Sequence, residues 1–164
     1  MREQRHHRLM KPLGLSDPWF AVRIEATDKS WTAKFVFVAA NAWSSAQSTW
    51  LSKELAKDTT YTFIMRHEGK GVTDAPAVDP SDAIIAKHPY TLLIVGHAHS
   101  YAKLTGQRTV LVGNGGAPLT GNVNYGYVIA RQRSDGAIVF REHDYSTQAV
   151  KDTFAVKADG TFTK

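Results

Sequence analysis

The stretch Leu92-Leu93-Ile94-Val95-Gly96-His97-Ala98-His99 decides both the fold prediction and the function prediction. Four apolar residues end at a glycine, and two histidines follow, two positions apart. A short apolar run of this kind is typical of a buried β-strand, and residues two apart in an extended chain face the same side. We therefore expect His97 and His99 to converge on one centre, or on two adjacent ones, at the end of a strand.

A third histidine, His67, follows the apolar run of residues 61–65 and Arg66 in the same way. In an α/β sheet, the loops at the carboxyl ends of the strands build the binding site. Imidazole suits zinc, iron, manganese and nickel alike, so His67, His97 and His99 are candidate metal ligands. A lone His-x-His pair is also typical of ordinary surface histidines. The other histidines are interpreted as structural or incidental: His6, His7, His88 and His143.

Composition limits the classes of protein and of site. The chain has 164 residues, of which 43% are hydrophobic and 21% charged, as in one ordinary globular domain. It has no cysteine, which excludes disulfides and thiolate ligands, so a metal must be held by His, Asp, Glu, Asn or water. No apolar run reaches transmembrane length, and no apolar stretch supports a signal peptide near the N-terminus.

The formal net charge is +5, and much of it lies in residues 1–11, where four basic residues against Glu3 give +3. We interpret residues 1–18 as a flexible basic tail, since no aromatic or periodic pattern accompanies the charge. Such a tail can touch nucleic acid or anionic lipid, but we expect neither a nucleic-acid nor a membrane partner. A positive protein also suits an anionic substrate such as a phosphate ester.

Strands and helices alternate in the first half of the predicted structure. Strands are expected at 19–26, 34–40, 60–66 and 90–95 from their apolar patterns. One helix should start at Ser44, where Ser44 and Gln47 fit a capping box, with an apolar stripe of Ala46, Trp50, Leu51 and Leu55. A second helix should start with Asp79 as its N-cap and Pro80 at its first position, and end near His88.

Short strands separated by turns are expected in the second half, at 107–112, 125–133, 137–143 and 153–156. Asp135-Gly136 between two apolar runs indicates a hairpin. We see no internal repeat and no linker, so residues 19–164 are predicted to form one α/β unit with a mixed β-sheet and helices. The turn Gly113-Asn114-Gly115-Gly116 has two interpretations, a phosphate cradle built from backbone amides or an ordinary glycine-rich turn.

The order of these motifs resembles the calcineurin-like metallophosphoesterases, in their purple-acid-phosphatase-like and bacterial branches. The resemblance covers about residues 19–145: Asn-Ala-Trp, a helix with Gln47 and Trp50-Leu51, Arg66-His67-Glu68, Gly96-His97-Ala98-His99-Ser100-Tyr101 and Gly113–Pro118. It implies an αββα sandwich around two metal ions (zinc, iron or manganese) and hydrolysis of phosphate mono- or diesters by a metal-activated hydroxide. It further implies that His67 and His97 share one metal, that His99 reaches the other, and that Arg66, Glu68 and Asn114 are supporting or substrate-binding candidates.

The family's first three motifs are missing from this chain. Asp-x-His, Gly-Asp-x-x-Asp and Gly-Asn-His-Glu/Asp do not occur, and these motifs carry the carboxylate that bridges two metals. The chain therefore resembles the C-terminal half of the sandwich, a half-domain with an incomplete metal site that we expect to be inactive alone. Its expected partners are a phosphate-ester substrate if the site is completed, and the missing N-terminal half or a second copy. The alternative is a non-catalytic binding or interaction module that retains the half-fold.

Overall fold

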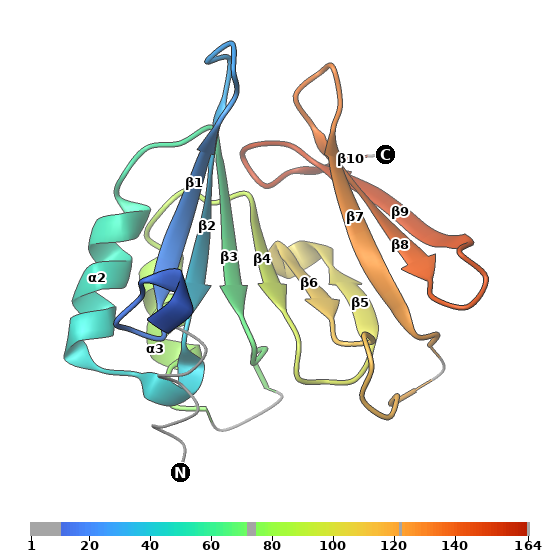
Figure 1. The fold of residues 1–164 in the computed structure, drawn as a ribbon, viewed down its shortest axis with the longest axis horizontal. Helices are drawn as coiled ribbons and strands as arrows, with labels where there is room; N and C mark the ends of the chain where they lie inside the picture. Colours follow the sequence, from blue (N-terminus) through green and yellow to red (C-terminus); the bar gives the residue numbers. More distant parts are fainter. Residues whose placement is uncertain (1–10, 72–74, 122, 164) are drawn as a thin grey trace.

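A computed structural model describes residues 11–71, 75–121 and 123–163 (Figure 1). Ten of the residues assigned to the basic tail, 1–10, lie outside the described residues, and Lys11–Leu13 form a short 3-10 helix, η1. Within the described part, ten strands form two sheets, and two α-helices pack against one of them. The two sheets face each other across the centre of the molecule.

Sheet A contains six strands in the order β1-β2-β3-β4-β6-β5. Its four central strands are parallel, and an antiparallel strand lies at each edge. The central strands are rich in Val, Ile, Leu and Phe, as expected where both faces of a parallel sheet are buried. The strands are β1 (Phe20–Glu25), β2 (Thr32–Val38), β3 (Tyr61–Arg66), β4 (Leu92–Val95), β5 (Tyr101–Leu104) and β6 (Thr109–Val112).

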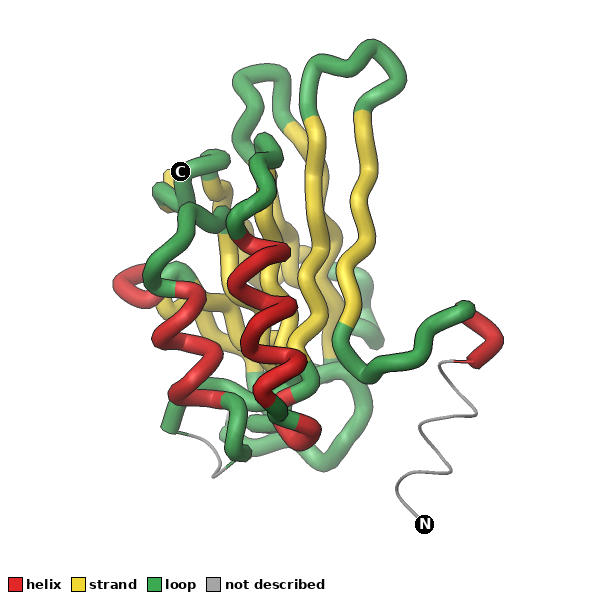
Figure 2. Tube along the Cα trace, turned by 90° about the vertical axis from the view of Figure 1, so that its left-hand side faces the viewer, coloured by secondary structure: helices red, strands yellow, loops and turns green. Residues whose placement is uncertain are grey.

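The helices lie side by side on one face of sheet A, as Figure 2 shows. They are α2 (Ser45–Leu55) and α3 (Val78–Ile85), with short 3-10 turns η2 (Ala40–Ala42) and η3 (Thr105–Gln107). Leu51, Leu55 and Ile85 of these helices form a core with residues of β2, β3 and β4. None of the described helices is long and apolar enough to cross a membrane.

Sheet B is an antiparallel meander in the order β10-β9-β8-β7, formed by β7 (Gly126–Gln132), β8 (Ile138–Asp144), β9 (Val150–Val156) and β10 (Phe162–Thr163). Its inner face packs on the face of sheet A that the helices leave free. Phe140, Phe154 and Val156 meet Tyr61 and Phe63 there, with the rings of Phe63 and Phe140 edge to face at 6.3 Å. This second core holds the two sheets together.

The predicted fold class is wrong. We expected an α/β unit with a single mixed sheet, the C-terminal half of an αββα sandwich. The described chain is instead mostly β, with two sheets and only two α-helices, both on one face of sheet A. The physical reason lies in the pairing of the later strands. β6 and β5 extend sheet A beyond β4, whereas β7–β10 pair only with one another.

Two helix starts also differ in detail from the predictions. Ser44 Oγ accepts the backbone N–H of Gln47, as a capping residue should, but the Gln47 side chain does not return to Ser44. It is buried and bonds Ala39 and Ala42 instead, while Ala46 of the predicted apolar stripe is exposed. Helix α3 begins at Val78, so Asp79 lies in its first turn and is not its N-cap.

Candidate metal centre

Three neighbouring parallel strands bring polar side chains to one edge of sheet A. Val38 at the end of β2 pairs with Arg66 at the end of β3, and Arg66 pairs with Val95 at the end of β4. The residues that follow these strands therefore lie at the same edge, as expected for the carboxyl ends of parallel strands. This edge carries Asn41 after β2, His67 and Glu68 after β3, and His97 after β4.

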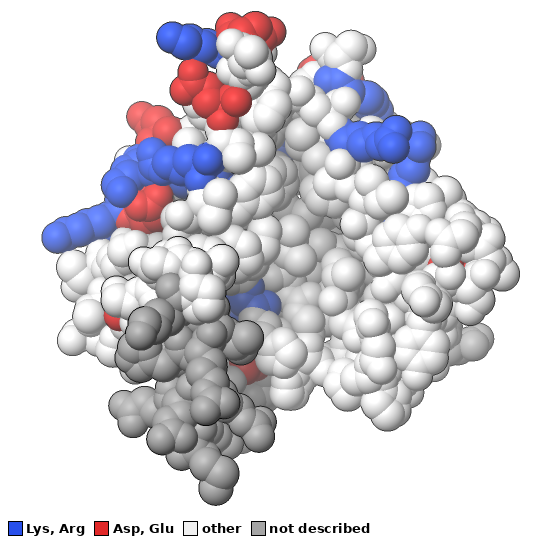
Figure 3. Space-filling model, viewed as in Figure 1, with Lys and Arg blue, Asp and Glu red and all other residues white. Residues whose placement is uncertain are grey.

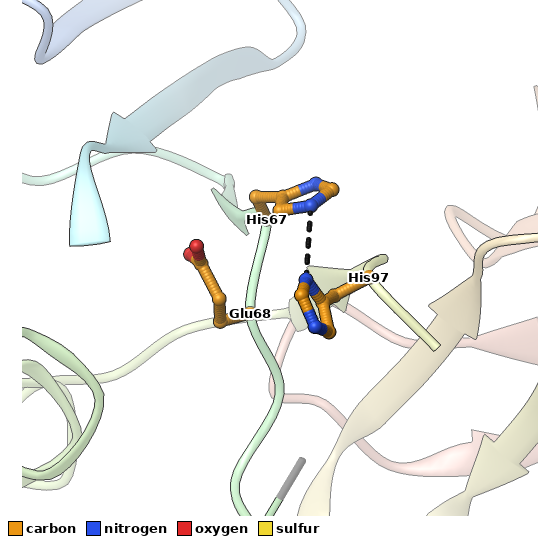
Figure 4. A group of neighbouring side chains, drawn as sticks. All are labelled: His67, Glu68 and His97. Carbon is orange, nitrogen blue, oxygen red and sulfur yellow. Dashed lines mark hydrogen bonds between the residues drawn. The ribbon is translucent and has the colours of Figure 1, made fainter. Parts of the chain in front are cut away.

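The imidazoles of His67 and His97 face each other at this edge (Figure 4). His97 Nδ1 lies 3.2 Å from His67 Nε2, and the two rings are nearly perpendicular, at 81°. In neutral rings, one nitrogen can donate a hydrogen bond to the other. The spacing also suits two ligands of one tetrahedral metal, since metal–nitrogen bonds of about 2.0–2.1 Å place their nitrogens roughly 3.3 Å apart.

Glu68 completes a group of three ligands with the two histidines. One ligand atom from each of His67, Glu68 and His97 lies within 4.8 Å of the others. Glu68 is only 2% exposed, and its Oε1 accepts a hydrogen bond from Asn41 Nδ2. No cationic side chain among the described residues pairs with this carboxylate. A buried carboxylate that lacks a cation is costly, so the residues present fit a divalent cation, and two His with one Glu is a known zinc ligand set.

The backbone at His97 is in the left-handed region, with φ +66°. The chain turns tightly there, since the N–H of Ala98 bonds the carbonyl of Gly96 at 2.8 Å. Gly96 N–H bonds the carbonyl of His67 at 2.9 Å, which ties the two ligand loops together one step beyond the end of the strands. A left-handed residue other than glycine costs about 1–2 kcal/mol, and such strain clusters at functional sites, although Lys29, Arg108 and Gln148 also have positive φ.

His99 is held by a different part of the chain. Its Nδ1 lies 2.8 Å from the carbonyl oxygen of Pro118, and its own carbonyl accepts the N–H of Thr120. Donation from Nδ1 to a backbone carbonyl leaves Nε2 as the nitrogen with a free lone pair, an arrangement common in metal-binding histidines. His99 nevertheless does not belong to the group formed by His67, Glu68 and His97. The structure therefore brings together two of the three predicted histidines.

The two other supporting candidates do not belong to the ligand group. Arg66 contacts it, because its Nε donates a hydrogen bond to the backbone carbonyl of Glu68 at 2.7 Å. Arg66 lies within the helix-covered side, where its guanidinium bonds the carbonyl of Val78, Ser81 Oγ and Asp82 of α3. It is buried and fixes α3 on the sheet. Asn114 is fully buried, and its Nδ2 donates to Asn124 and Glu142. Asn114 thus joins the 113–116 turn to sheet B.

The glycine-rich turn 113–116 packs against the loop that carries His97 and His99. A Cβ on Gly113 would overlap the carbonyl of Ala98, so only glycine allows the two loops to lie this close. Gly113 N–H also bonds the carbonyl of Ser100 at 2.8 Å. Close backbone packing therefore explains this glycine without a bound phosphate.

Sequence reasoning missed Asn41 as a functional candidate. The signal was present, because Asn41 follows a strand that is parallel to β3, and the carboxyl ends of parallel strands meet. The tripeptide Asn41-Ala42-Trp43 contributes to the prediction only as one of the motifs whose order resembles the metallophosphoesterases. Its amide now explains how Glu68 is oriented.

Comparison with known proteins identifies a fold neighbour but no family. No family model matches the chain, and no curated protein matches it. Among solved structures, the chain is similar to "GAP50 the anchor in the inner membrane complex of Plasmodium", with a TM-score of 0.68 and 13% sequence identity. The match covers 90% of this chain and 56% of the GAP50 chain. The chain thus spans little more than half the length of this neighbour, and the likeness concerns the fold alone.

Proposed function

We propose that this chain carries part of a metal-dependent phosphoesterase site, in which His67, Glu68 and His97 hold a divalent cation. The observation that carries the proposal is the clustering of their ligand atoms within 4.8 Å at the carboxyl edge of three parallel strands. The resemblance of the motif order to the metallophosphoesterases supplies the reaction class. A bound cation would act as a Lewis acid on a phosphoryl oxygen.

The chain's own residues would have separate roles in binding the cation and the substrate. Glu68, buried and oriented by Asn41, supplies the negative charge that a cation needs. His67 and His97 are exposed, so the ligand group opens to solvent on their side. The hydrogen bond of His99 to Pro118 fixes its ring, which leaves its other nitrogen to bind a substrate oxygen or a second ion.

We expect little activity from the chain alone. The motifs that would supply a carboxylate between two metals are missing from the sequence. One cation provides only half of the clamp that two metals place on the attacking and leaving oxygens. A second part, from a longer chain or from a partner, would have to complete the site.

The second candidate is an interaction module without catalysis. The name of the fold neighbour describes an anchor, and this chain exposes apolar side chains on the edge strand β1, where Val22 is 46% and Ile24 44% exposed. Such a surface suits contact with another protein. The ligand group of His67, Glu68 and His97 would then have a structural role, or would be left over from an ancestral metal site.

Zinc binding tests the metal proposal directly. Equilibrium dialysis of the chain against zinc should give one ion per chain. His97→Ala and Glu68→Gln should abolish binding, since each removes a ligand. Asn41→Ala should weaken it by roughly 10–100-fold, the usual effect of losing a residue that orients a ligand.

His88→Ala is the matched control, because His88 lies beyond the end of α3 and outside the ligand group. It should bind zinc like the unchanged chain. Equal binding by the His97 variant would refute the proposal. With zinc, manganese or iron added, turnover of a model phosphate ester should stay below about 1 per second. A higher turnover that disappears in His97→Ala would show that the three ligands suffice for catalysis.

A further inference from the structure

The outer face of sheet B carries an unusual set of side chains. Because side chains alternate along a strand, the residues of β7 on this face are Tyr127, Ile129 and Arg131, and they lie opposite His143, Arg141 and Val139 of β8. The inner face of the same strands is in the core. A solvent-facing sheet surface usually mixes small polar residues and charges of both signs. On β7 and β8 it holds two rings and two arginines beside Ile129 and Val139, and no acidic residue.

Positive charge gathers at one end of this face. Arg131, Arg133 and Arg141 line a hollow of about 240 Å³, together with Ile129, Gln132, Val139 and His143. Arg133 pairs with Asp135. Arg131 and Arg141 are exposed and have no acidic partner among the described residues. Figure 3 shows the contrast: basic side chains cluster over the upper end of β7, whereas those over β1 and α2 are mixed with acidic ones.

Aromatic rings occupy the other end of the face. The rings of Tyr127 and His143 stack with centroids 5.3 Å apart and planes within 6°. Tyr127 is 36% exposed, and its hydroxyl is fixed by Gln148 Oε1 at 2.5 Å. Tyr125 and Tyr145 stand at the end of the same hairpin, 44% and 69% exposed, and the N–H of Tyr145 bonds the carbonyl of Tyr125. Gln148 therefore holds the rings of Tyr127 and His143, and all three tyrosines are open to solvent.

We propose that this face binds single-stranded nucleic acid. Proteins that bind single strands combine a positive groove that follows the phosphates with aromatic rings on which bases stack. Arg131 and Arg141 supply planar donors that match phosphate oxygens. The Tyr127–His143 pair supplies a stacking platform two residues from Arg141 along β8 and four residues from Arg131 along β7. A membrane surface fits less well, because β7 and β8 place only two aliphatic side chains on this face, Ile129, which is 37% exposed, and Val139, which is half-buried.

This proposal departs from the expectation that the protein has no nucleic-acid partner. That expectation considered only the charge of residues 1–11. The sequence of residues 125–133 predicts a strand, but it does not show which face of that strand is exposed. Only the pairing of β7 with β8 shows that the tyrosines and arginines share one exposed surface.

Fluorescence polarisation with labelled oligo-dT and oligo-rU of about 15 nucleotides tests the proposal. Affinity should fall as salt rises, with each phosphate contact contributing about −0.7 to the slope of log K against log salt. The double variant Arg131→Gln/Arg141→Gln should bind at least about tenfold more weakly at low salt, and its slope should be smaller by roughly 1.4. Tyr127→Leu should also weaken binding, whereas Tyr127→Phe should not.

The matched control is Lys53→Gln/Lys87→Gln, which removes two exposed positive charges from the helix-covered side. It should change affinity by less than about twofold. Equal losses in both double variants would mean that net charge alone attracts the strand, and would overturn the proposal. Failure to bind either oligonucleotide would overturn it too, as would binding only to vesicles that contain anionic phosphatidylserine.

Discussion

At the scale of single residues, His97 combines a ligand with a strained backbone. Its φ of +66° is one that glycine adopts freely and other residues at a cost of about 1–2 kcal/mol. Glycine also makes the unfolded chain more flexible, which lowers the free energy of unfolding by about 0.5–1 kcal/mol and offsets part of the strain relieved. His97→Gly should therefore raise the free energy of unfolding by about 0.5–1 kcal/mol, while zinc binding is lost. Urea unfolding without metal, together with the dialysis measurement, checks both effects.

Lys29→Gly separates the two effects. Lys29 has φ +60° in the exposed turn between β1 and β2, at the opposite end of β2 from the ligand group (Figure 1). This control should gain similar stability and keep its zinc binding. A clear loss of stability in the metal-free His97→Gly variant would show that the imidazole is needed for folding, and that the strain is not maintained for a ligand.

The sequence was sufficient to find the two central histidines, because His67 and His97 each follow a clear apolar run. It was not sufficient to assign Glu68 as a ligand or to find Asn41. Both assignments depend on which strands are neighbours. The contact of Asn41 with Glu68 spans 27 positions along the chain, and no local pattern records such a distance.

At the scale of elements, Glu54 fastens helix α2 to the edge of sheet A. Its carboxylate accepts hydrogen bonds from Arg23 of β1 at 2.8 Å and from Lys57 at 2.5 Å. Burial acts to raise the pKa of Glu54, but the hydrogen bonds and charges of Lys57 and Arg23 outweigh burial and hold this pKa below its usual value. The ion pairs should therefore stabilise the fold only while Glu54 is ionised.

The sign of the pH effect follows from this lowered pKa. The contribution of Glu54 is fully present above its unfolded pKa of about 4.3 and is lost as the pH falls through the lower folded value. Glu54→Gln should destabilise the chain at pH 7 and should lose less further stability than the unchanged chain between about pH 5 and pH 3. Urea unfolding at several pH values gives both slopes.

Glu25→Gln is the control for this prediction, because Glu25 ends the same edge strand, is exposed and pairs with no basic side chain among the described residues. Its pH dependence should match that of the unchanged chain. If Glu54→Gln also keeps the full acid sensitivity, the acid response must come from other carboxyl groups, such as Asp152 beside Lys103.

Most strands and both α-helices were predicted within a few residues from their apolar patterns. The exceptions were β5 and β10, which the sequence did not indicate. β5 has only four residues, half-buried or exposed, and β10 has two, so neither shows an apolar period. The start of α3 was misplaced because its N-cap position, Ala77, has no side-chain cap. Lys34 lies in the predicted buried strand and is satisfied by carbonyls at the end of α2, those of Glu54 and Leu55 at 2.9 and 3.3 Å.

At the scale of the whole molecule, the division into two sheets could not be derived from local patterns. The turns of the second half indicated an antiparallel meander, and β7–β10 form one. No local sequence pattern shows that β6 pairs in parallel with β4 instead of joining the meander, or that β5 forms the edge strand of sheet A. That choice is made by packing between the sheets, where Phe140 and Phe154 of sheet B meet residues of sheet A.

The inner face of sheet A is not covered evenly by sheet B. Near β1, a hollow of about 280 Å³ is lined mainly by apolar side chains, among them Ile24, Trp31 and Phe35. Val22 and Ile24 of β1 are nearly half exposed, and β1 is an edge strand with its outer side unpaired. Exposed apolar surface beside an open strand edge favours association.

We therefore expect the chain alone to dimerise or aggregate at low micromolar concentration, as light scattering would show. Val22→Thr/Ile24→Thr should reduce association, because threonine keeps the β-branched shape of these residues and removes much of their apolar surface. Leu104→Thr, on the opposite edge strand β5 and 39% exposed, is the control and should associate like the unchanged chain. A clean monomer with a cooperative melt and no binding of a dye for apolar surface would contradict this prediction. It would mean that the two sheets are self-sufficient, and it would favour the interaction module over part of an enzyme.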